Sequence, residues 1–424
     1  MIPLKFGKGN VDWQERINFD ALRKKRVERA QKYMAKYGIG AAIIYNHDRR
    51  RYVSYPWNHP YAKQVPAYFA LLIRGAGFPY VSLHEHLDFK PMQENAPWLE
   101  GRILTEKELW QPRTYRYMTP EMIKTQYSTT AKQVKGLMKK HGVADMPLSI
   151  DFCNPNMIFH LQKAGLKVVD GNSWMDECGM VKFDEEILLM KMAASIVEAG
   201  YGELVKDFRI GMTENQAQAL MAKGIYAAGG EYIEGWVVNS GDRTNPRNFN
   251  WSDRICRPGE FLTMEPCHVN YCGYKVCYDR TFLVGAKPTD LQKKLYQVAV
   301  DLHAKFKAVV KPGMTTHDLA TMKPRAWVNF QFPSELKKFK VTFSNHSAGM
   351  GITWDSGPHF YSTNDPEIEI ERNMTLTYHV RVRMDSPEGY EAGGLAVENT
   401  YRVTKTGVES LCKWPYEEIM TIGL

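Results

Sequence analysis

The chain has 424 residues, of which 44% are hydrophobic and 24% are charged, and its formal net charge at pH 7 is +8. This length and composition predict a globular protein with two domains. No run approaches the roughly 18 consecutive apolar residues of a membrane helix, so we expect no membrane partner.

The basic residues are spread along the chain, with only two short runs, at 24–26 and 49–51. This distribution favours attraction of small anionic or zwitterionic substrates and argues against nucleic acid as a partner. The first residues contain no apolar signal core, and the seven cysteines are an odd number. We therefore expect a cytoplasmic protein with reduced thiols rather than a disulfide framework.

The first half of the chain alternates helical and extended patterns, as an α/β domain does. Apolar residues at near-helical spacing predict a helix over 19–37, ending at Gly38, and the apolar run at 41–45 predicts a buried strand. Further strands are predicted at 67–73, 80–83 and 148–151, and further helices near 129–141 and 155–164. We place the N-terminal domain at 1–175.

The second half, 176–424, contains an internal repeat. Three acidic residues at 184–186 open a long helical pattern, at the end where the helix dipole favours negative charge. Gly-Met-Thr-Glu at 211–214 and Gly-Met-Thr-Thr at 313–316 each follow a long helical pattern and begin another helix. Thr213 and Gln216 form a capping box at the first of these starts. Two similar half-units predict a pseudo-twofold α+β domain with a binding cleft between the halves.

The segment 265–282 has the outline of a metal-binding hairpin, with Tyr-Cys-Gly-Tyr at 271–274 and Arg-Thr-Phe at 280–282. It resembles the hairpin of the creatinase, aminopeptidase P and methionine aminopeptidase clan. The resemblance implies a pita-bread fold for the C-terminal domain. It puts Glu265 or Pro266, and then Cys277, at the two positions where the clan carries a metal-binding Asp. We therefore do not expect an ordinary dinuclear peptidase.

The chain is most similar to non-peptidase members of that clan, namely the M24-type dimethylsulfoniopropionate lyase, creatinase and ectoine hydrolase. Tyr-Ile-Glu at 232–234 and Ser-Gly-Asp-Arg-Thr-Asn-Pro at 240–246 resemble segments of the lyase, and Trp-Asn-His-Pro at 57–60 resembles another more loosely. The resembling enzymes complete their sites across a dimer. The resemblance therefore implies a homodimer in which Trp57 and His59 of one N-terminal domain reach the other subunit's cleft.

The clan binds two divalent ions with two Asp, one His and two Glu, because hard cations that bridge a water need anionic oxygens. Carried over by resemblance, this set becomes Cys277, His346, His379 and Glu398, with Glu265 as a further possible ligand. Such a softer set suits one zinc or iron ion. The alternative, for which creatinase is the metal-free precedent, is that no metal is bound and these residues contact the substrate directly. Both readings stay open.

The other two cysteines of the hairpin, Cys267 and Cys272, are interpreted as packing residues, since small buried cysteines are common in sheets. His268 alternates with Cys267 along the predicted strand, so we expect it to point elsewhere and to be structural.

The resemblance implies three candidates for a general base. Asp355 follows His346 as the lyase's proton-abstracting Asp does, and burial beside Trp354 would raise its pKa. A turn residue before Ser-Gly-Pro is the alternative reading of Asp355. His346 and His379 suit proton transfer near neutral pH, and together with Glu398 they could activate water for hydrolysis.

Charges of both signs are available to bind a zwitterion. Arg243, Arg381 and Arg383 can clamp a carboxylate, because the guanidinium fork pairs with it through two hydrogen bonds. Asp279 could bind a cationic group, although a salt bridge to adjacent strands explains it equally. Aromatic residues, among them Trp57 and Trp354, could hold an onium group by cation–π attraction.

The sequence thus predicts an enzyme that cleaves a C–S or C–N bond of a small zwitterionic or betaine-like metabolite. A lyase working by proton abstraction and elimination is the first interpretation. A hydrolase similar to creatinase or ectoine hydrolase is the alternative. A non-catalytic pita-bread module that binds a protein partner is the third, and polar residues at three ligand positions argue against it.

Overall fold

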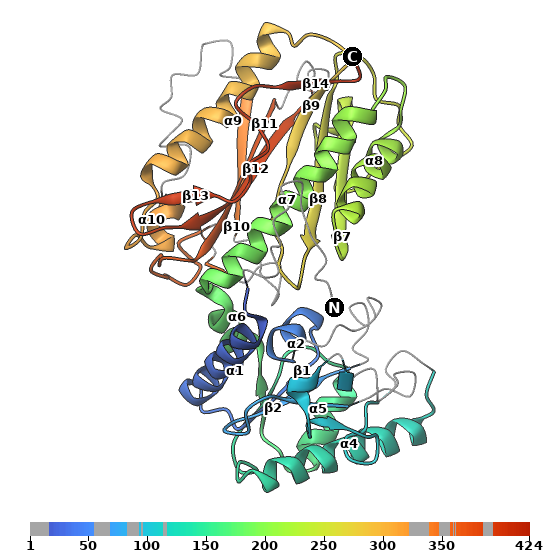
Figure 1. Ribbon diagram of the computed structural model, residues 1–424, viewed down its shortest axis with the longest axis vertical. Coiled ribbons are helices and arrows are strands. Elements are labelled where there is room, and N and C mark those ends of the chain that lie inside the picture. The colour runs from blue at the N-terminus through green and yellow to red at the C-terminus, as the bar shows by residue number, and fades with distance from the viewer. Residues whose placement is uncertain are drawn as a thin grey trace. The chain divides into compact units, whose positions relative to one another are not determined.

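The computed structural model describes residues 17–54, 68–82, 93–94, 96–112, 117–321, 357–358, 360, 362–384 and 393–424, together with the backbone of 339–346. These residues form two compact units, an N-terminal unit that ends at Gly179 and a C-terminal unit that begins at Met180. The sequence placed this boundary between 175 and 176. The two units are drawn in Figure 1, and each is described by itself.

A six-stranded mixed sheet forms the centre of the N-terminal unit, in the order β4-β3-β2-β1-β5-β6. β1 pairs with β2 in antiparallel fashion and with β5 in parallel fashion. The strands are β1 (Ala41–Ile44), β2 (Ala70–Ile73), β3 (Tyr80–Ser82), β4 (Ile103–Leu104), β5 (Leu148–Ile150) and β6 (Val168–Asp170). The two strands at the ends of this order, β4 and β6, are short segments that the apolar pattern did not predict.

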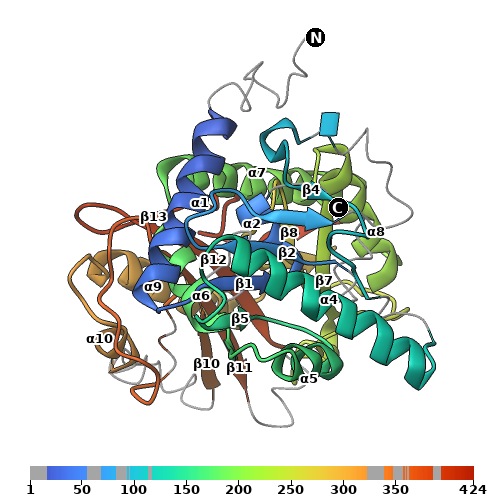
Figure 2. The ribbon, with the colours of Figure 1, turned by 90° about the horizontal axis from the view of Figure 1, so that it is seen from below.

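The helices of this unit are α1 (Phe19–Lys36), α2 (His47–Ser54), the 3-10 helix η3 (Pro97–Leu99), α4 (Pro120–Lys140), α5 (Pro155–Lys163) and α6 (Asn172–Met180). Tyr127 and Val134 of α4 and Met157 of α5 share a buried cluster with Ile43 and Leu71 of the sheet, and Figure 2 shows α4 and α5 beside these strands. α4 begins nine residues before the predicted 129, where Thr119 caps it and Pro120 occupies its first turn. The predicted α/β class of this unit is confirmed.

The C-terminal unit consists of two similar halves. Each contributes two helices and then three strands of a four-stranded sheet, and a final strand completes each sheet in the orders β14-β9-β8-β7 and β10-β11-β12-β13. The first half holds α7 (Asp184–Asp207), α8 (Glu214–Ala227), β7 (Tyr232–Ser240), the 3-10 helix η4 (Gly241–Arg243), β8 (Phe261–Asn270) and β9 (Arg280–Val284). The second holds α9 (Asp290–Val309), α10 (Thr316–Thr321), β10 (Phe339–His346), β11 (Thr375–Met384), β12 (Leu395–Val403), β13 (Val408–Ser410) and β14 (Met420–Ile422).

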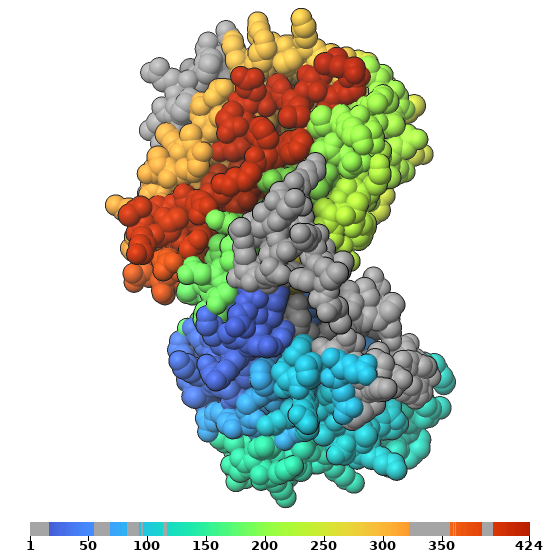
Figure 3. All heavy atoms as spheres, in the orientation of Figure 1, coloured from blue at the N-terminus to red at the C-terminus, as the bar shows by residue number. Residues whose placement is uncertain are grey.

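This arrangement confirms the predicted pseudo-twofold pita-bread domain. The repeated glycines Gly211 and Gly313 both have a left-handed φ, +91° and +86°, in the turn between the two helices of their half. The predicted capping box of Thr213 and Gln216 is present at α8. In the space-filling view the segment from β12 to the C-terminus, in red, lies between α9, in orange, and α8, in green (Figure 3).

No helix in the ranges given above is both long and apolar enough to cross a membrane.

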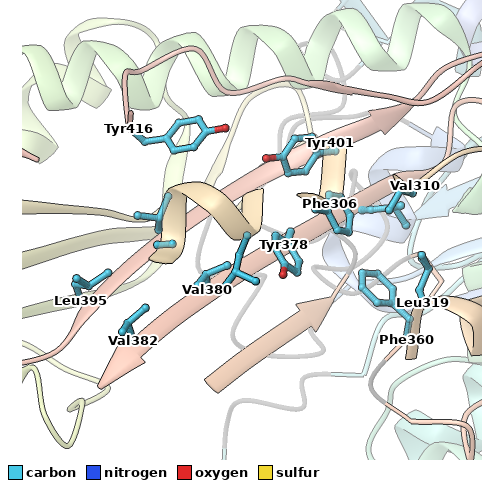
Figure 4. Close-up of a cluster of buried hydrophobic side chains, with 14 of the residues drawn as sticks. Phe306, Val310, Leu319, Phe360, Tyr378, Val380, Val382, Leu395, Tyr401 and Tyr416 are labelled. Atoms are coloured by element: carbon cyan, nitrogen blue, oxygen red, sulfur yellow. The ribbon is translucent and has the colours of Figure 1, made fainter. Parts of the chain in front are cut away.

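The second half packs its sheet against α9 through an aromatic core, shown in Figure 4. Phe306 of α9 stacks on Tyr378 of β11 with ring centroids 4.4 Å apart. His303, one turn earlier on α9, is fully buried, with Nδ1 2.8 Å from the Tyr401 hydroxyl and Nε2 3.1 Å from the Val397 carbonyl oxygen. Burial disfavours the charged imidazolium and lowers the pKa of His303 to about 3.

This buried histidine predicts acid sensitivity. Between about pH 6.5, where an unfolded histidine titrates, and about pH 3, the unfolded chain binds a proton at His303 that the folded chain does not. As the pH is lowered through this window, the free energy of unfolding should therefore fall by about 1.4 kcal/mol per pH unit because of this residue. Denaturant unfolding at several pH values measures the slope of the unfolding free energy against pH. In His303→Gln this slope should be smaller by the contribution of about one proton. His317→Gln, a part-exposed residue of α10, is the control. An unchanged slope in His303→Gln would contradict the assignment.

Candidate active site

The two sheets of the C-terminal unit meet where Asp279, just before β9, forms a β-bridge with Glu398 of β12. Glu398 is also directly opposite His379 of β11 in the antiparallel register. Directly opposite residues place their side chains on the same face of a sheet. The strand pairing therefore gathers His379, Glu398 and Asp279, and their side chains are 1%, 0% and 0% exposed.

His379 lies between the two carboxylates. Its Nε2 is 3.2 Å from Asp279 Oδ2, and its Nδ1 is 3.1 Å from Glu398 Oε1. A proton taken up by this imidazole would give an imidazolium with a carboxylate beside each ring nitrogen.

The guanidinium of Arg247 contacts two of the acidic residues of this site. Arg247 donates from Nη1 to Asp279 Oδ2 over 2.7 Å and from Nη2 to Glu265 Oε2 of β8. Its Nη1 is also 3.3 Å from His379 Nε2. The sequence interpretation missed Arg247, although it directly follows the quoted Thr-Asn-Pro segment, which was the available signal.

These charges shift one another's pKa values. Burial opposes the ionisation of Asp279, but Arg247 and then His379 outweigh it, and the pKa of Asp279 is lowered. Burial likewise opposes the charge on Arg247, but Asp279 and Glu265 outweigh it and raise the pKa of the guanidinium. Arg381 of β11 is different, because burial, followed by repulsion from Arg247, lowers its pKa.

The described residues contain one set of donors close enough to share a metal ion, namely Glu265, Asp279 and His379, whose ligand atoms lie within 4.8 Å of one another. Arg247 already bonds to both carboxylates and lies against the imidazole. A divalent ion at this point would meet a positively charged group instead of open ligand positions. Glu265, Asp279 and His379 are therefore a possible metal-binding set, and Arg247 contacts the same atoms that would bind an ion.

A small cavity of about 290 Å³ adjoins this cluster. Three arginines, Arg247, Arg381 and Arg383, line it together with Phe249. Arg381 Nε lies 3.4 Å from His379 Nε2, and its guanidinium is 5.4 Å from the centre of the Phe249 ring. A ligand in the cavity would therefore meet positively charged side chains. One of them, Arg381, is in contact with His379.

The structure assigns two predicted residues to other contacts. Arg243 donates from Nε to both oxygens of the fully buried Glu214 and from Nη2 to Asn250, and it does not line the cavity. Cys277 Sγ is 2.8 Å from His268 Nε2, and Cys277 is not among the grouped metal donors. His268 therefore points towards Cys277, a contact that the sequence interpretation, which had it pointing away from Cys267, did not foresee. Asp279 forms the salt bridge that was its alternative reading.

Other residues predicted for the site cannot be placed relative to this cluster. Trp57, His59, Trp354 and Asp355 lie outside the described residues. For His346 only the backbone is described, and it pairs with Thr377 on β11.

Comparison with known proteins agrees with this architecture. Residues 188–405, more than half of the chain, match the model of metallopeptidase family M24. The chain is 23% identical over 298 residues to dimethylsulfoniopropionate lyase DddP of Roseovarius nubinhibens, which covers 68% of this chain and 64% of the lyase, less than two thirds of its length. It is 22% identical over 412 residues to creatinase of a Bacillus species, covering 92% and 90% of the two chains.

Among solved structures, an Xaa-Pro dipeptidase from Bacillus anthracis superposes with a TM-score of 0.71 at 20% identity, covering 94% of this chain and all of the dipeptidase. At this identity the likeness concerns the fold alone.

The central position of Arg247 predicts a large effect on stability. Arg247→Met leaves Glu265 and Asp279 buried without their guanidinium, which should cost about 3–5 kcal/mol of unfolding free energy at pH 7. In wild type, Asp279 has a lowered pKa, so its contribution is present above the unfolded value and is lost as the pH falls through the folded one. In the variant only His379 is left to oppose the effect of burial on Asp279, so the stability deficit of the variant should shrink as the pH is lowered towards 4. Denaturant unfolding at several pH values measures this.

Adding Asp279→Asn to Arg247→Met should recover part of the loss, because the two residues are directly paired. Strictly additive losses in this double-mutant cycle would contradict the coupling.

Proposed function

This chain belongs to metallopeptidase family M24, and on that premise we propose that it is an enzyme that cleaves a C–S or C–N bond of a small zwitterion, by elimination. The observation that carries the proposal is the arginine-lined cavity next to His379. A volume of about 290 Å³ suits a small metabolite rather than a long peptide.

Recognition of the substrate rests on its carboxylate. Arg381 and Arg383 are alternate residues of β11 and both line the cavity, so one carboxylate can bind to both guanidinium groups. Arg247 lines the same cavity but is committed to Glu265 and Asp279. Phe249, which is 71% exposed, lies under the Arg381 guanidinium and adds apolar surface to the cavity.

Proton abstraction is assigned to His379. A carboxylate bound to Arg381 lies beside the imidazole, because Arg381 Nε is 3.4 Å from His379 Nε2. His379 is 1% exposed and does not line the cavity, so it takes the proton alpha to that carboxylate only once Arg381 moves aside, and Asp279 and Glu398 then stabilise the imidazolium from both sides. The arginines stabilise the negative charge that develops on the substrate. Asp355, the base expected from the sequence, stays a candidate outside the described residues.

The relatives support this class and leave a second candidate. The lyase relative favours elimination. The creatinase relative, which matches over most of both chains, favours hydrolysis of a C–N bond instead, with His379 and Glu398 activating water. The homodimer, with Trp57 and His59 reaching the partner's site, also stays part of the proposal.

Positive charge at the junction of the sheets is assigned to Arg247 in place of a resident metal ion. Family members of this type hold ions by means of carboxylates and histidine, and here the guanidinium contacts both carboxylates and the imidazole of the available donor set. The catalytic proposal accordingly uses only side chains.

The reaction type is tested on dimethylsulfoniopropionate, creatine, ectoine and carnitine in heavy-oxygen water. Elimination gives an alkene without label, whereas hydrolysis places the label in a product.

On the accepted substrate, Arg381→Met should lower kcat/KM by about 10- to 100-fold, because a charged hydrogen bond is lost. Arg209→Met, an exposed arginine of the same unit, is the matched control and should leave kcat/KM unchanged. Turnover in Arg381→Met equal to wild type would contradict the assigned carboxylate site.

The role of Arg247 is tested by metal analysis. Elemental analysis of wild type purified without added metal should find less than about a tenth of an equivalent of zinc, iron or manganese, and a chelator should leave the melting temperature unchanged. Arg247→Ala frees Glu265, Asp279 and His379, so Mn²⁺ or Zn²⁺ should raise the melting temperature of this variant and not that of wild type. Arg247→Ala combined with Asp279→Asn is the control that should lose the response. Near one equivalent of metal in wild type would overturn the assignment.

A further inference from the structure

A second group of reactive side chains comes from β7, from β8 and from the connection between β8 and β9. Cys277 Sγ is 2.8 Å from His268 Nε2, and the other ring nitrogen of His268, Nδ1, is 3.2 Å from Glu234 Oε2. Lys275 donates to the second oxygen of Glu234 over 2.7 Å. A thiol, an imidazole and a carboxylate thus follow one another at contact distance.

Strand pairing explains half of this arrangement. In the antiparallel register Ile233 is opposite Val269 and Gly235 is opposite Cys267, which makes Glu234 and His268 cross-strand neighbours. Glu234 and His268 are not themselves paired in the strand ladder, because His268 has φ +53°. This value lies in the left-handed region that non-glycine residues rarely adopt. A strained backbone conformation of this kind costs free energy and persists only because the surrounding structure holds it. Strained residues are frequent at functional sites.

Contacts with β12 hold the thiol in place. The Cys277 amide donates to Thr400 Oγ1 over 3.0 Å, and that hydroxyl donates to the Cys277 carbonyl oxygen, also over 3.0 Å. The group is enclosed, with Cys277 and Lys275 1% exposed and His268 9% exposed. Any compound that reacts there must be small.

From this geometry we propose that Cys277, His268 and Glu234 form a nucleophilic site that takes small acyl compounds, with Cys277 as nucleophile, His268 as general base and Glu234 as the residue that orients the imidazole. The proposal does not rest on the lyase or hydrolase assignment. Its residues are separate from the His379 cluster.

The reaction proceeds in two balanced steps. The thiol proton passes to His268 Nε2 as sulfur bonds to the acyl carbon, and the leaving group departs with that proton. Water, deprotonated by His268, then attacks the thioester, the C–S bond breaks, and the sulfur recovers its proton. The net change is hydrolysis of the acyl compound.

The direct test treats the intact protein with p-nitrophenyl acetate and locates acetyl groups by peptide mass spectrometry. We expect a burst of up to one p-nitrophenolate per chain, acetylation of Cys277, and slow loss of the acetyl group. His268→Gln should slow acetylation by at least about 100-fold, as removal of a general base does. Cys256→Ser removes another fully buried cysteine, whose pKa burial raises to about 11, and should leave the burst unchanged. Absence of acetyl-Cys277 in wild type would overturn the proposal.

A second measurement needs no variant. Iodoacetamide, a small thiol reagent, should alkylate Cys277 of wild type at least about tenfold faster than Cys256 or Cys412, which are buried with pKa values raised by burial. Equal or slower alkylation of Cys277 would count against an activated thiol.

The orienting role of Glu234 has its own readout. Glu234→Gln should move the pH midpoint of Cys277 alkylation upwards, because the imidazolium loses its carboxylate, and Glu234→Asp should restore part of the shift. A change in melting temperature without a change in the pH profile would assign Glu234 a structural role only.

Discussion

The C-terminal unit depends on how it accommodates negative charge at the junction of its two sheets. Glu265, Asp279 and Glu398 come from three strands or strand ends that the pseudo-twofold topology brings together, and Asp279 and Glu398 are fully buried. A buried charge must be paired, because the free-energy cost of its desolvation otherwise exceeds the free energy gained from packing. Arg247 meets this requirement for two of the three carboxylates, and His379 lies against Asp279 and Glu398.

This pairing accounts for the chemistry of the site as well as its stability. A guanidinium has a fixed charge, a planar fork and no open position for water or substrate, so it cannot polarise a bound water as an open metal site does. What remains is an imidazole with a carboxylate beside each ring nitrogen, next to a cavity that carries three arginines. This arrangement is the basis of the proposed proton transfer on a carboxylate-bearing substrate.

The segment 265–282 also contributes to a second polar group, which includes Cys277. A thiol two residues before Asp279 does not join the carboxylate cluster. Its neighbour is His268, whose left-handed backbone places the imidazole between Cys277 and Glu234. The unusual backbone conformation of His268 thus accompanies a second polar group, chemically different from the carboxylate cluster.

The sequence by itself determined the class of each unit, the central strands, the long helices and the internal repeat, because these follow from local periodicity, capping and turn glycines. The family resemblance also suggested His379 and Glu398 as site residues, and the strand register places them side by side. Only the tertiary structure decided which charges meet. Arg247 belongs to an irregular segment, and nothing local indicates that its side chain reaches Glu265 and Asp279. The same holds for Arg243, which pairs with Glu214 across 29 residues, and for the contact of His268 with Cys277. Periodicity reports the local backbone, whereas ion pairing depends on distances that exist only once the two sheets have joined.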